Sequence, residues 1–487
     1  MSTHLWLEQL NGLGLPVKRV VADSRQVRPG DVFLACMGEY RDGRDFISKA
    51  IDAGAAAVLW DDADGFVWQA EWSLPNRPVS GLRWCAGEIA SHVNGSPSEQ
   101  MTVIGVTGTN GKTSISTWLS HALTHLGKRT AVIGTVGNGF PGALEHTTHT
   151  TPDAVTLQDR LLAYRQQGAE AIAMEVSSHG LDQGRVNGVA FDVAVFTNLT
   201  RDHLDYHGDM ASYGESKAKL FQWPGLRKAV INLDDPFGVK LAALAQENDI
   251  AVWGYGLREG ELHCRELKVD EAGIRMTVVT PAGEVLIRSG LLGLFNASNL
   301  LAALGAMLAI GVAPAEAAQA LSEIDAAPGR MQRLGGESTP LVVVDYAHTP
   351  DALDKALSTL REILPAHRQL YCVFGCGGDR DPGKRPLMGS VVCRQADVPV
   401  VTSDNPRTED PDVIIEHIRA GMSCDYRVEV DRAMAIRWAV ADAKPGDIVL
   451  IAGKGHEDYQ DVQGVKTPFS DVEQARAALT RYAGDRR

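Results

Sequence analysis

The chain has 487 residues, of which 44% are hydrophobic and 22% are charged, and its formal net charge is −14. A single hydrophobic core stops growing near roughly 250 to 300 residues, so this length predicts two or three domains. The composition is that of a globular protein and excludes wholesale disorder. The acidic balance argues against nucleic acid as the main partner, because phosphate backbones bind basic surfaces.

The seven cysteines are scattered along the chain and show no CxxC spacing. An odd, scattered set of this kind predicts reduced thiols rather than a disulfide framework or a zinc site. The first ten residues lack the basic and apolar regions of a signal peptide, and no run of 18 apolar residues occurs. These features predict a cytoplasmic protein that has no membrane partner.

Two changes in composition divide the chain. Residues 93–100 are polar and rich in turn formers, which is typical of a linker. Residues 326–340 are rich in glycine and proline and end just before a strongly apolar segment. The predicted domains cover residues 1–96, 97–336 and 337–487.

Short apolar segments alternate with helical ones throughout the chain. In the first domain, strands over 31–35 and 56–60 flank a helix over 45–53, which predicts a small α/β unit. The later strands are rich in β-branched residues, as strands buried on both faces should be. They cover residues 102–106, 171–176, 193–196 and 229–232 in the second domain, and 341–345, 371–374, 398–401 and 447–451 in the third. This alternation predicts a mostly parallel, doubly wound central domain and a Rossmann-like C-terminal domain.

The sharpest motif is a glycine-rich turn between the strand at 102–106 and a helix expected from Ser114. It consists of Gly108, Thr109, Asn110, Gly111, Lys112 and Thr113. Backbone amides of such a turn bind phosphates, Lys112 would reach the β- and γ-phosphates, and the Thr113 hydroxyl would bind magnesium. The spacing differs from GxxxxGK[ST], because Val106 stands where the first glycine would be. The motif predicts ATP as the nucleotide.

Further polar groups follow the next two strands. Glu175 lies at the carboxyl end of its strand, where a carboxylate can complete a magnesium shell. His203 belongs to the polar segment TNLTRDHLDYHG, and from spacing both a ligand role and a surface role are open. By itself, Lys217 in YGESKAKLF is typical of a solvated helix lysine.

GTNGKT, EVSSHGL and TNLTRDHLDYHG, in this order, resemble segments of the Mur ligase family, which also includes folylpolyglutamate synthetase and cyanophycin synthetase. The resemblance implies that Glu175 and His203 bind the metal together with Thr113. It also implies that Lys217 is the lysine that carbon dioxide carboxylates. The catalytic residues implied are Lys112, Glu175, His203 and Lys217.

The same resemblance assigns the adenine and ribose of ATP to Asn296, Arg330 and Asp345. Helix capping is the competing interpretation of Asn296 and Asn299, because an apolar helix is expected from residue 300 to residue 310.

The amino-acid substrate is indicated by Asp404-Asn405-Pro406-Arg407, which by itself is typical of a β-turn. In the Mur ligases this motif is found in members that add meso-diaminopimelate, which has one carboxylate more than lysine. A guanidinium can bind that carboxylate in bidentate fashion. The implied contacts are Arg380, Asp404, Asn405, Pro406, Arg407, Gly453 and Glu457. The basic residues of the GCGGDRDPGKR segment, residues 375–385, suit an anionic substrate or a phosphate.

The contacts that the resemblance implies for the UDP-linked substrate come from the first two domains. They are Ala22, Ser24, His149, Thr150, Thr151, Ser177, Gln183 and Arg185. Glu39, Tyr40 and Arg41 stand where the family has a different sequence, so the contacts there are undecided.

Together the motifs imply an ATP- and magnesium-dependent ligase that acts as a monomer. It would join meso-2,6-diaminopimelate to the D-glutamate carboxylate of UDP-N-acetylmuramoyl-L-alanyl-D-glutamate through an acyl phosphate, in peptidoglycan precursor synthesis. A lysine-adding homologue and a polyglutamate-type ligase are the alternatives within the family. A nucleotide switch that hydrolyses ATP without ligation is the alternative outside it.

Overall fold

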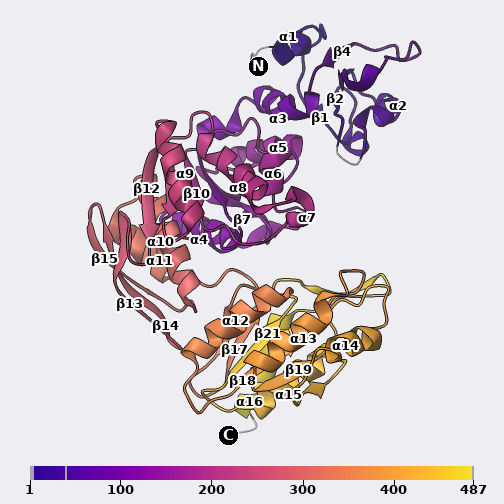
Figure 1. The fold of residues 1–487 in the computed structure, drawn as a ribbon. Coiled ribbons are helices and arrows are strands. Elements are labelled where there is room, and N and C mark those ends of the chain that lie inside the picture. Colours follow the sequence, from indigo (N-terminus) through magenta and orange to yellow (C-terminus); the bar gives the residue numbers. More distant parts are fainter. Residues whose placement is uncertain (1–4, 39–40, 148, 485–487) are drawn as a thin grey trace. The chain divides into compact units, whose positions relative to one another are not determined.

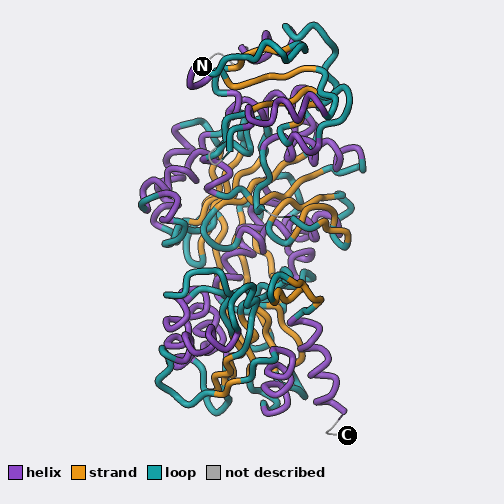
Figure 2. The backbone as a smooth tube through the Cα atoms, turned by 90° about the vertical axis from the view of Figure 1, so that its right-hand side faces the viewer, coloured by secondary structure: helices purple, strands orange, loops and turns teal. Residues whose placement is uncertain are grey.

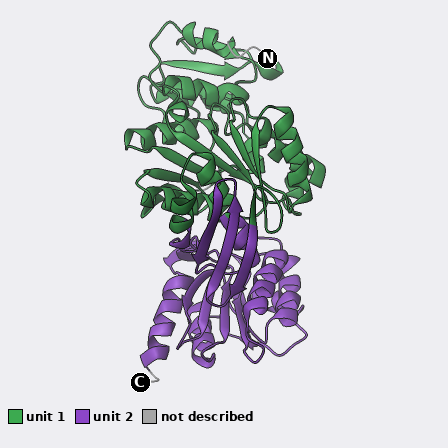
Figure 3. Cartoon of the chain, turned by 90° about the vertical axis from the view of Figure 1, so that its left-hand side faces the viewer, with its two compact units in different colours: residues 1–263, 301–320 green, residues 264–300, 321–487 purple. Residues whose placement is uncertain are grey.

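The computed structural model describes residues 5–38, 41–147 and 149–484. The chain divides into two compact units, coloured separately in Figure 3: residues 1–263 with 301–320, and residues 264–300 with 321–487. Strands and helices occur in both units (Figure 3) and are coloured by type in Figure 2, which confirms the predicted α/β class. In the described part of the chain, no helix combines the length and the apolar character needed to span a membrane.

The first unit begins with a sheet of order β1-β2-β3-β4, in which neighbouring strands are parallel (Figure 1). Its elements are α1 (Leu5–Asn11), β1 (Val20–Val21), β2 (Val32–Ala35), α2 (Ile47–Asp52), β3 (Ala57–Asp61), β4 (Asn76–Val79) and α3 (Leu82–Val93). The predicted helix over 45–53 begins later, at Ile47, because a 3-10 turn capped by Asp42 precedes it. Both predicted strands are present within one residue.

The larger sheet of the first unit has the order β12-β11-β10-β5-β9-β6-β7-β8. Neighbouring strands are parallel from β12 to β6, while β7 and β8 are antiparallel. The strands are β5 (Thr102–Thr107), β6 (Thr130–Gly134), β7 (Gly137–Phe140), β8 (Ala143–Glu145), β9 (Ala171–Glu175), β10 (Val193–Phe196), β11 (Lys228–Asn232) and β12 (Ala251–Gly256). Because β5 lies between β9 and β10, the carboxyl ends of these three strands are neighbours.

Helices connect these strands, and β5, β9 and β10 are buried along nearly their whole length. The helices are α4 (Lys112–His125), α5 (Ala154–Gln166), α6 (Ser178–Asp182), α7 (Leu204–His207), α8 (Met210–Ala218) and α9 (Pro236–Glu247). Part of the segment predicted to be a linker, residues 93–100, has regular structure. Residues 97–100 form a 3-10 helix, and the buried Ser98 hydroxyl accepts a hydrogen bond from the Ala190 amide.

The next four elements include two positions at which the chain crosses from one unit to the other. They are β13 (Leu262–Asp270), the antiparallel pair β14 (Gly273–Thr280) and β15 (Gly283–Ser289), and the helix α10 (Leu294–Ala309). Helix α11 (Pro314–Ser322) comes next. The expected start of a helix at residue 300 is wrong, because α10 begins at Leu294.

The second unit contains a sheet of order β16-β17-β21-β18-β19-β20, parallel except for β16. The strands are β16 (Gln332–Gly335), β17 (Leu341–Asp345), β18 (Leu370–Phe374), β19 (Val398–Val401), β20 (Arg427–Val428) and β21 (Ile448–Ala452), with a hairpin of β22 (Tyr459–Val462) and β23 (Val465–Pro468). The helices are α12 (Pro350–Ile363), α13 (Lys384–Gln395), α14 (Pro411–Arg419), α15 (Arg432–Asp442) and α16 (Asp471–Gly484). The Rossmann-like sheet that the sequence predicts is present.

Candidate active site

The glycine-rich turn joins β5 to α4, as predicted. Gly108 has φ +143°, and a Cβ atom there would lie 1.9 Å from the Thr197 hydroxyl oxygen, so no other residue fits. Gly111 has φ +91° and begins the helix at Lys112, two residues before the predicted start. The N-cap residue of α4, Gly111, has no side chain that could cap the helix. The amides of its first turn are therefore suited to bind a phosphate.

Two lysine ammonium groups meet at the start of this turn. Lys112 Nζ donates to the carbonyl oxygens of Gly108 and Thr109, both at 2.8 Å. Lys217 Nζ donates to the same Gly108 oxygen at 3.0 Å. The Lys217 side chain is 1% exposed, which overturns its interpretation as a solvated lysine. Burial, followed by the Lys112 charge, holds the pKa of Lys217 well below its ordinary value.

Glu175 is buried at the end of β9 and faces the phosphate loop. Its Oε2 accepts hydrogen bonds from the hydroxyls of Thr113 at 3.0 Å and Thr135 at 3.2 Å. Its Oε1 accepts from the Thr135 amide at 2.6 Å. Gly134 is required beside it, because a Cβ atom there would lie 2.3 Å from Oε1. The structure thus places two of the predicted metal ligands, Thr113 and Glu175, in contact.

His203 begins α7 in the left-handed conformation, with φ +53°. Its ring lies 4.9 Å from the ring of His179, and the ring of Tyr213 lies 6.1 Å from it, measured between centroids. Lys217 Nζ lies 4.3 Å from the Tyr213 ring centroid, so Tyr213 lies beside both predicted groups. Burial lowers the pKa of His203, and burial with the neighbouring His203 and His207 rings lowers that of His179 to about 4. Lowered pKa values favour the neutral imidazole, the form that binds metals.

The predicted metal ligands do not form one ready cluster. Over the residues that the structure describes, no three His, Cys, Asp or Glu side chains are arranged to hold a metal ion. The pair Thr113 and Glu175 supplies oxygen donors beside the phosphate loop, which suits a hard cation that also binds phosphate oxygens. The residues therefore fit magnesium bound jointly with a nucleotide.

Several residues predicted to bind the UDP-linked substrate lie together in space at the carboxyl end of β9. The Thr151 hydroxyl contacts the Ser177 hydroxyl at 3.1 Å, and Arg185 donates to the Thr151 carbonyl at 2.9 Å. Arg185 also donates to the Gln183 side-chain oxygen at 2.6 and 2.9 Å. The Thr150 hydroxyl lies 3.1 Å from that of Thr135, which also contacts Glu175. These side chains are thus connected to the phosphate loop.

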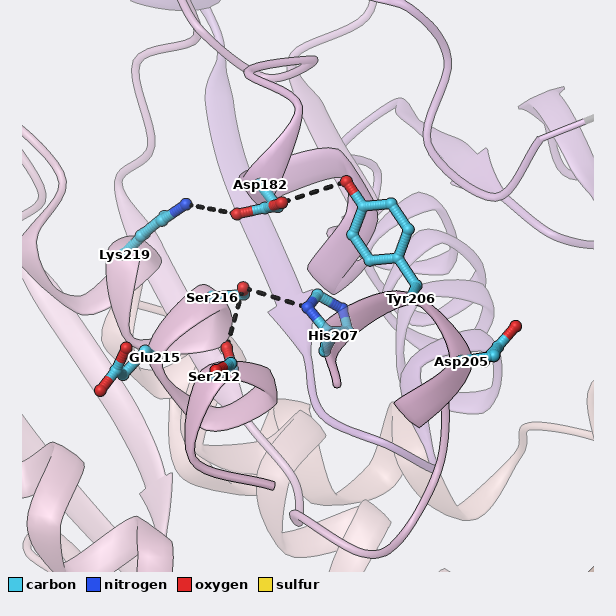
Figure 4. A pocket seen from close by; sticks show the side chains of 8 residues that line it. All are labelled: Asp182, Asp205, Tyr206, His207, Ser212, Glu215, Ser216 and Lys219. Atoms are coloured by element: carbon cyan, nitrogen blue, oxygen red, sulfur yellow. Dashed lines mark hydrogen bonds and ion pairs between the residues drawn. The ribbon is translucent and has the colours of Figure 1, made fainter. Parts of the chain in front are cut away.

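The hydrogen bonds continue from Gln183 into a cavity of about 510 Å³. Gln183 donates to the Tyr206 hydroxyl at 3.2 Å. The Tyr206 hydroxyl donates to Asp182 at 3.0 Å, and Lys219 pairs with Asp182 at 2.8 Å (Figure 4). The cavity is lined by Asp182, Asp205, Tyr206, His207, Ser212, Glu215, Ser216 and Lys219. The sequence motifs did not indicate Asp182, Tyr206 or Lys219 as site residues, although Tyr206 lies inside TNLTRDHLDYHG and Lys219 lies inside YGESKAKLF.

Three further residues predicted to contact the UDP-linked substrate are Ala22 and Ser24 in the first predicted domain and His149 in the second. Ala22 precedes a 3-10 turn that contains Ser24 and is capped by Asp23. His149 is exposed. Glu39 and Tyr40 lie outside the described residues.

In the second unit, the predicted nucleoside contacts have well-defined surroundings. Asn296 and Asn299 lie inside α10, which excludes the capping interpretation, and Asn296 donates to the Leu292 carbonyl at 2.9 Å. The Arg330 guanidinium lies 5.0 Å from the ring centroid of Tyr346. Asp345 accepts hydrogen bonds from two backbone amides, and burial raises its pKa although Arg330 acts in the opposite direction.

The predicted amino-acid contacts follow β19 and β21, which lie close in the second sheet. Asn405 donates to Glu457 Oε2 at 2.7 Å, joining the two loops. Gly453 has φ +119°, and a Cβ atom there would lie 2.5 Å from Asp404 Oδ2. Arg407 donates to the Gly378 carbonyl at 2.7 Å. The structure therefore brings both segments of the predicted site together.

The basic residues after β18 have different roles. Arg380 is exposed, and its guanidinium donates to the Asp379 carbonyl at 3.5 Å. Arg385, by contrast, is buried and pairs with Glu409 at 2.8 Å. The prediction that the basic residues of this segment suit an anionic substrate or a phosphate is therefore wrong for Arg385, because this buried side chain is already neutralised by Glu409.

The prediction of seven reduced cysteines is also wrong. Cys393 in α13 forms a disulfide with Cys424, which follows α14. The two are 31 residues apart in sequence, and only the packing of α13 beside α14 makes them neighbours. The other five cysteines lie outside any disulfide.

Three family models match this chain. They are described as "Mur ligase family, catalytic domain", "Mur ligase middle domain" and "Mur ligase, glutamate ligase domain", and they match residues 16–92, 106–307 and 329–455. A UDP-N-acetylmuramoyl-L-alanyl-D-glutamate–2,6-diaminopimelate ligase from Chromobacterium violaceum is 61% identical over 474 residues, covering 97% of this chain and 96% of the relative. This chain belongs to the Mur ligase family. It is thus an amide-forming, ATP-dependent ligase, which confirms the predicted enzyme class.

Other members of the Mur ligase family are also similar to this chain. A relative of the same name from Neisseria meningitidis serogroup A is 54% identical, and the match covers 94% of both chains. A solved structure of a ligase with this name has a TM-score of 0.74, 39% identity and 96% coverage of both chains. The MurF ligase of Thermotoga maritima in complex with ADP has a TM-score of 0.63 at 20% identity, with 97% of this chain and 99% of that one covered, which shows a shared fold.

Proposed function

We propose that this Mur ligase joins meso-2,6-diaminopimelate to the D-glutamate carboxylate of UDP-N-acetylmuramoyl-L-alanyl-D-glutamate while ATP becomes ADP and phosphate. The observation that carries the proposal is the hydrogen bond between Asn405 and Glu457, which joins the DNPR loop to a carboxylate. A guanidinium from Arg407 and a carboxylate from Glu457 are complementary to an amino-acid zwitterion. The names of the relatives at 61% and 54% identity support the same substrate.

The phosphate loop and α4 bind the triphosphate in this proposal. Lys112 would exchange its contacts with Gly108 and Thr109 for phosphate oxygens, and the first-turn amides would stabilise charge on the transferred group. Asn296, Arg330 and Asp345 are assigned to the nucleoside. When bound at Thr113 and Glu175, magnesium would neutralise phosphate charge.

The first chemical step is attack of the D-glutamate carboxylate on the γ-phosphorus, which forms an acyl phosphate and releases ADP. The diaminopimelate amine then attacks the acyl carbon, and phosphate leaves. Thr151, Ser177, Gln183 and Arg185, with Thr150, His149, Ala22 and Ser24, are assigned to the UDP-linked substrate. Orientation of the two reacting groups accounts for most of the catalysis.

Lys217 is assigned to the site as the residue that carbon dioxide carboxylates. Its buried amine, with a lowered pKa, is suited to attack carbon dioxide, which forms a carbamate and releases a proton. The product is an anion, which would reverse the charge beside Lys112 and join His203 as a metal ligand. The same proposal divides the chain near residues 96 and 337 into parts that bind the UDP-linked substrate, ATP and the amino acid. It also places the protein in the cytoplasm as a monomer.

Phosphate release measured with a substrate panel tests this function. The proposed ligase should release phosphate and extend the peptide when ATP, magnesium, the UDP-linked dipeptide and meso-diaminopimelate are all present. Use of L-lysine with equal efficiency would favour the lysine-adding alternative. Phosphate release that ignores both the dipeptide and the amino acid would overturn ligation.

A further inference from the structure

Lys454 is a buried cation for which the proposed reaction has no direct use. Its side chain is 0% exposed, and it lies between β21 and the loop that carries Glu457. Nζ donates to Asn405 Oδ1 at 3.0 Å and to Glu457 Oε2 at 3.2 Å. It also lies 5.5 Å from the ring centroid of Tyr459. An ammonium group with no exposed surface cannot contact a bound substrate directly. It contacts Asn405 and Glu457, which are both assigned to the amino-acid substrate.

These contacts decide which way the Asn405 amide points. Asn405 Oδ1 accepts from Lys454 Nζ and from the Asp461 backbone amide, each at 3.0 Å. Rotating the amide by half a turn would place its NH₂ group against these two hydrogen-bond donors, and both hydrogen bonds would be lost. Nδ2 is therefore directed to Glu457 Oε2, at 2.7 Å.

Both internal donors to Glu457 use the same oxygen. Oε2 accepts from Asn405 and from Lys454, whereas Oε1 accepts no hydrogen bond from any residue that the structure describes. The carboxylate is thereby held with one oxygen turned inward and the other available to a cationic group. A buried lysine that fixes the amide also fixes the direction of this oxygen.

We propose that Lys454 is a positioning residue, which orients Asn405 and Glu457 so that Glu457 Oε1 receives an ammonium group of the amino-acid substrate. This inference rests on the proposed function and extends it to a residue behind the substrate site. Lys454 then acts on amino-acid affinity and selectivity, and not on the nucleotide. It acts through Glu457, so its effect depends on the Glu457 carboxylate being present.

A double-mutant cycle on the full chain tests the inference, with Lys454→Met, Glu457→Gln and the pair combined. Lys454→Met should raise the KM for meso-diaminopimelate at least tenfold and leave the KM for ATP within twofold. In the Glu457→Gln background the same change should alter the amino-acid KM less than threefold. Lys466→Met is the matched control, because Lys466 lies 4.0 Å from the same Tyr459 ring centroid and is exposed.

A KM for diaminopimelate within twofold of the original in Lys454→Met, or effects that multiply independently in the double variant, would overturn the inference. If Lys454→Met does not fold, Lys454→Gln decides the question, because its amide still donates a hydrogen bond and should give an intermediate KM. An unchanged KM in a folded Lys454→Gln variant would also count against it. An original chain that does not use diaminopimelate would instead remove the proposed function.

Discussion

The hydroxyl of Thr113, in the first turn of α4, donates a 3.0 Å hydrogen bond to the buried Glu175 carboxylate at the end of β9. A residue of the phosphate loop and a residue of the neighbouring strand thus share one small polar site. The contact follows from the strand order, because β9 pairs with β5 along its length. It places the oxygen atoms of two predicted metal ligands beside the phosphate loop.

Replacing Glu175 by Gln should lower kcat at least about 100-fold and raise the magnesium concentration needed for half-maximal activity. The amide keeps the shape of the side chain but loses the charge. Steady-state phosphate release over a magnesium titration measures both effects. Glu145→Gln is the control, since Glu145 is an exposed partner of Arg160. Equal magnesium dependence in the two variants would contradict a metal role for Glu175.

Activity should depend on dissolved carbon dioxide if Lys217 is carboxylated. Removing carbon dioxide from the buffer should lower kcat, and added bicarbonate should restore it. Lys217→Ala should be inactive with or without bicarbonate. Lys219→Ala should keep the bicarbonate response, because Lys219 is half exposed and paired with Asp182. A response that survives in Lys217→Ala would exclude Lys217 as the carboxylated group.

Arg407→Ala should raise the KM for meso-diaminopimelate by about 10- to 100-fold, which equals roughly 1.4 to 2.8 kcal/mol of lost binding. The reason is the loss of a guanidinium that is complementary to the extra carboxylate. Competition between diaminopimelate and L-lysine measures the accompanying loss of selectivity. Arg394→Ala is the matched control, since Arg394 forms a surface pair with Asp354. Retained selectivity in Arg407→Ala would remove this assignment.

Asp471→Asn should destabilise the second unit by about 3–5 kcal/mol, because it leaves a buried guanidinium without its anion. Arg432 and Asp471 are both 0% exposed and lie 2.7 Å apart, and Arg432 also donates to the carbonyls of Ala452 and Ser403. Thermal unfolding measures the loss. Asp354→Asn, at a surface pair, should change stability by about 1 kcal/mol or less. Equal decreases in melting temperature in the two variants would show that the buried pair stabilises the protein no more than the surface pair does.

The disulfide predicts the number of reactive thiols. Protein purified without reductant and then denatured should show five thiols per chain, and seven after reduction. Cys393→Ser should show six in both states, because one of the seven cysteines is removed and Cys424 is released. Seven thiols before reduction would show that the pair does not form in solution.

The strands that hold the active site could be predicted from the sequence because their signal is local. Burial on both faces requires continuous runs of apolar, β-branched residues, and β5 and β10 were predicted within one residue. The same holds for the phosphate loop, where Gly108 and Gly111 need backbone conformations that few residues adopt. The resemblance of the ordered motifs to those of the Mur ligases added a prediction of which side chains carry the chemistry, and this prediction is tested by the variants above.

Tertiary packing decided what no local pattern contains. Lys217 has the sequence of an exposed helix lysine, but α8 packs against the phosphate loop and buries it. Cys393 and Cys424 meet because α13 and α14 lie side by side. Lys454 faces Asn405 only because β19 and β21 end near each other with β18 between them. Burial, charge pairing and distance depend on elements that are far apart in the chain, so they are properties of the folded protein.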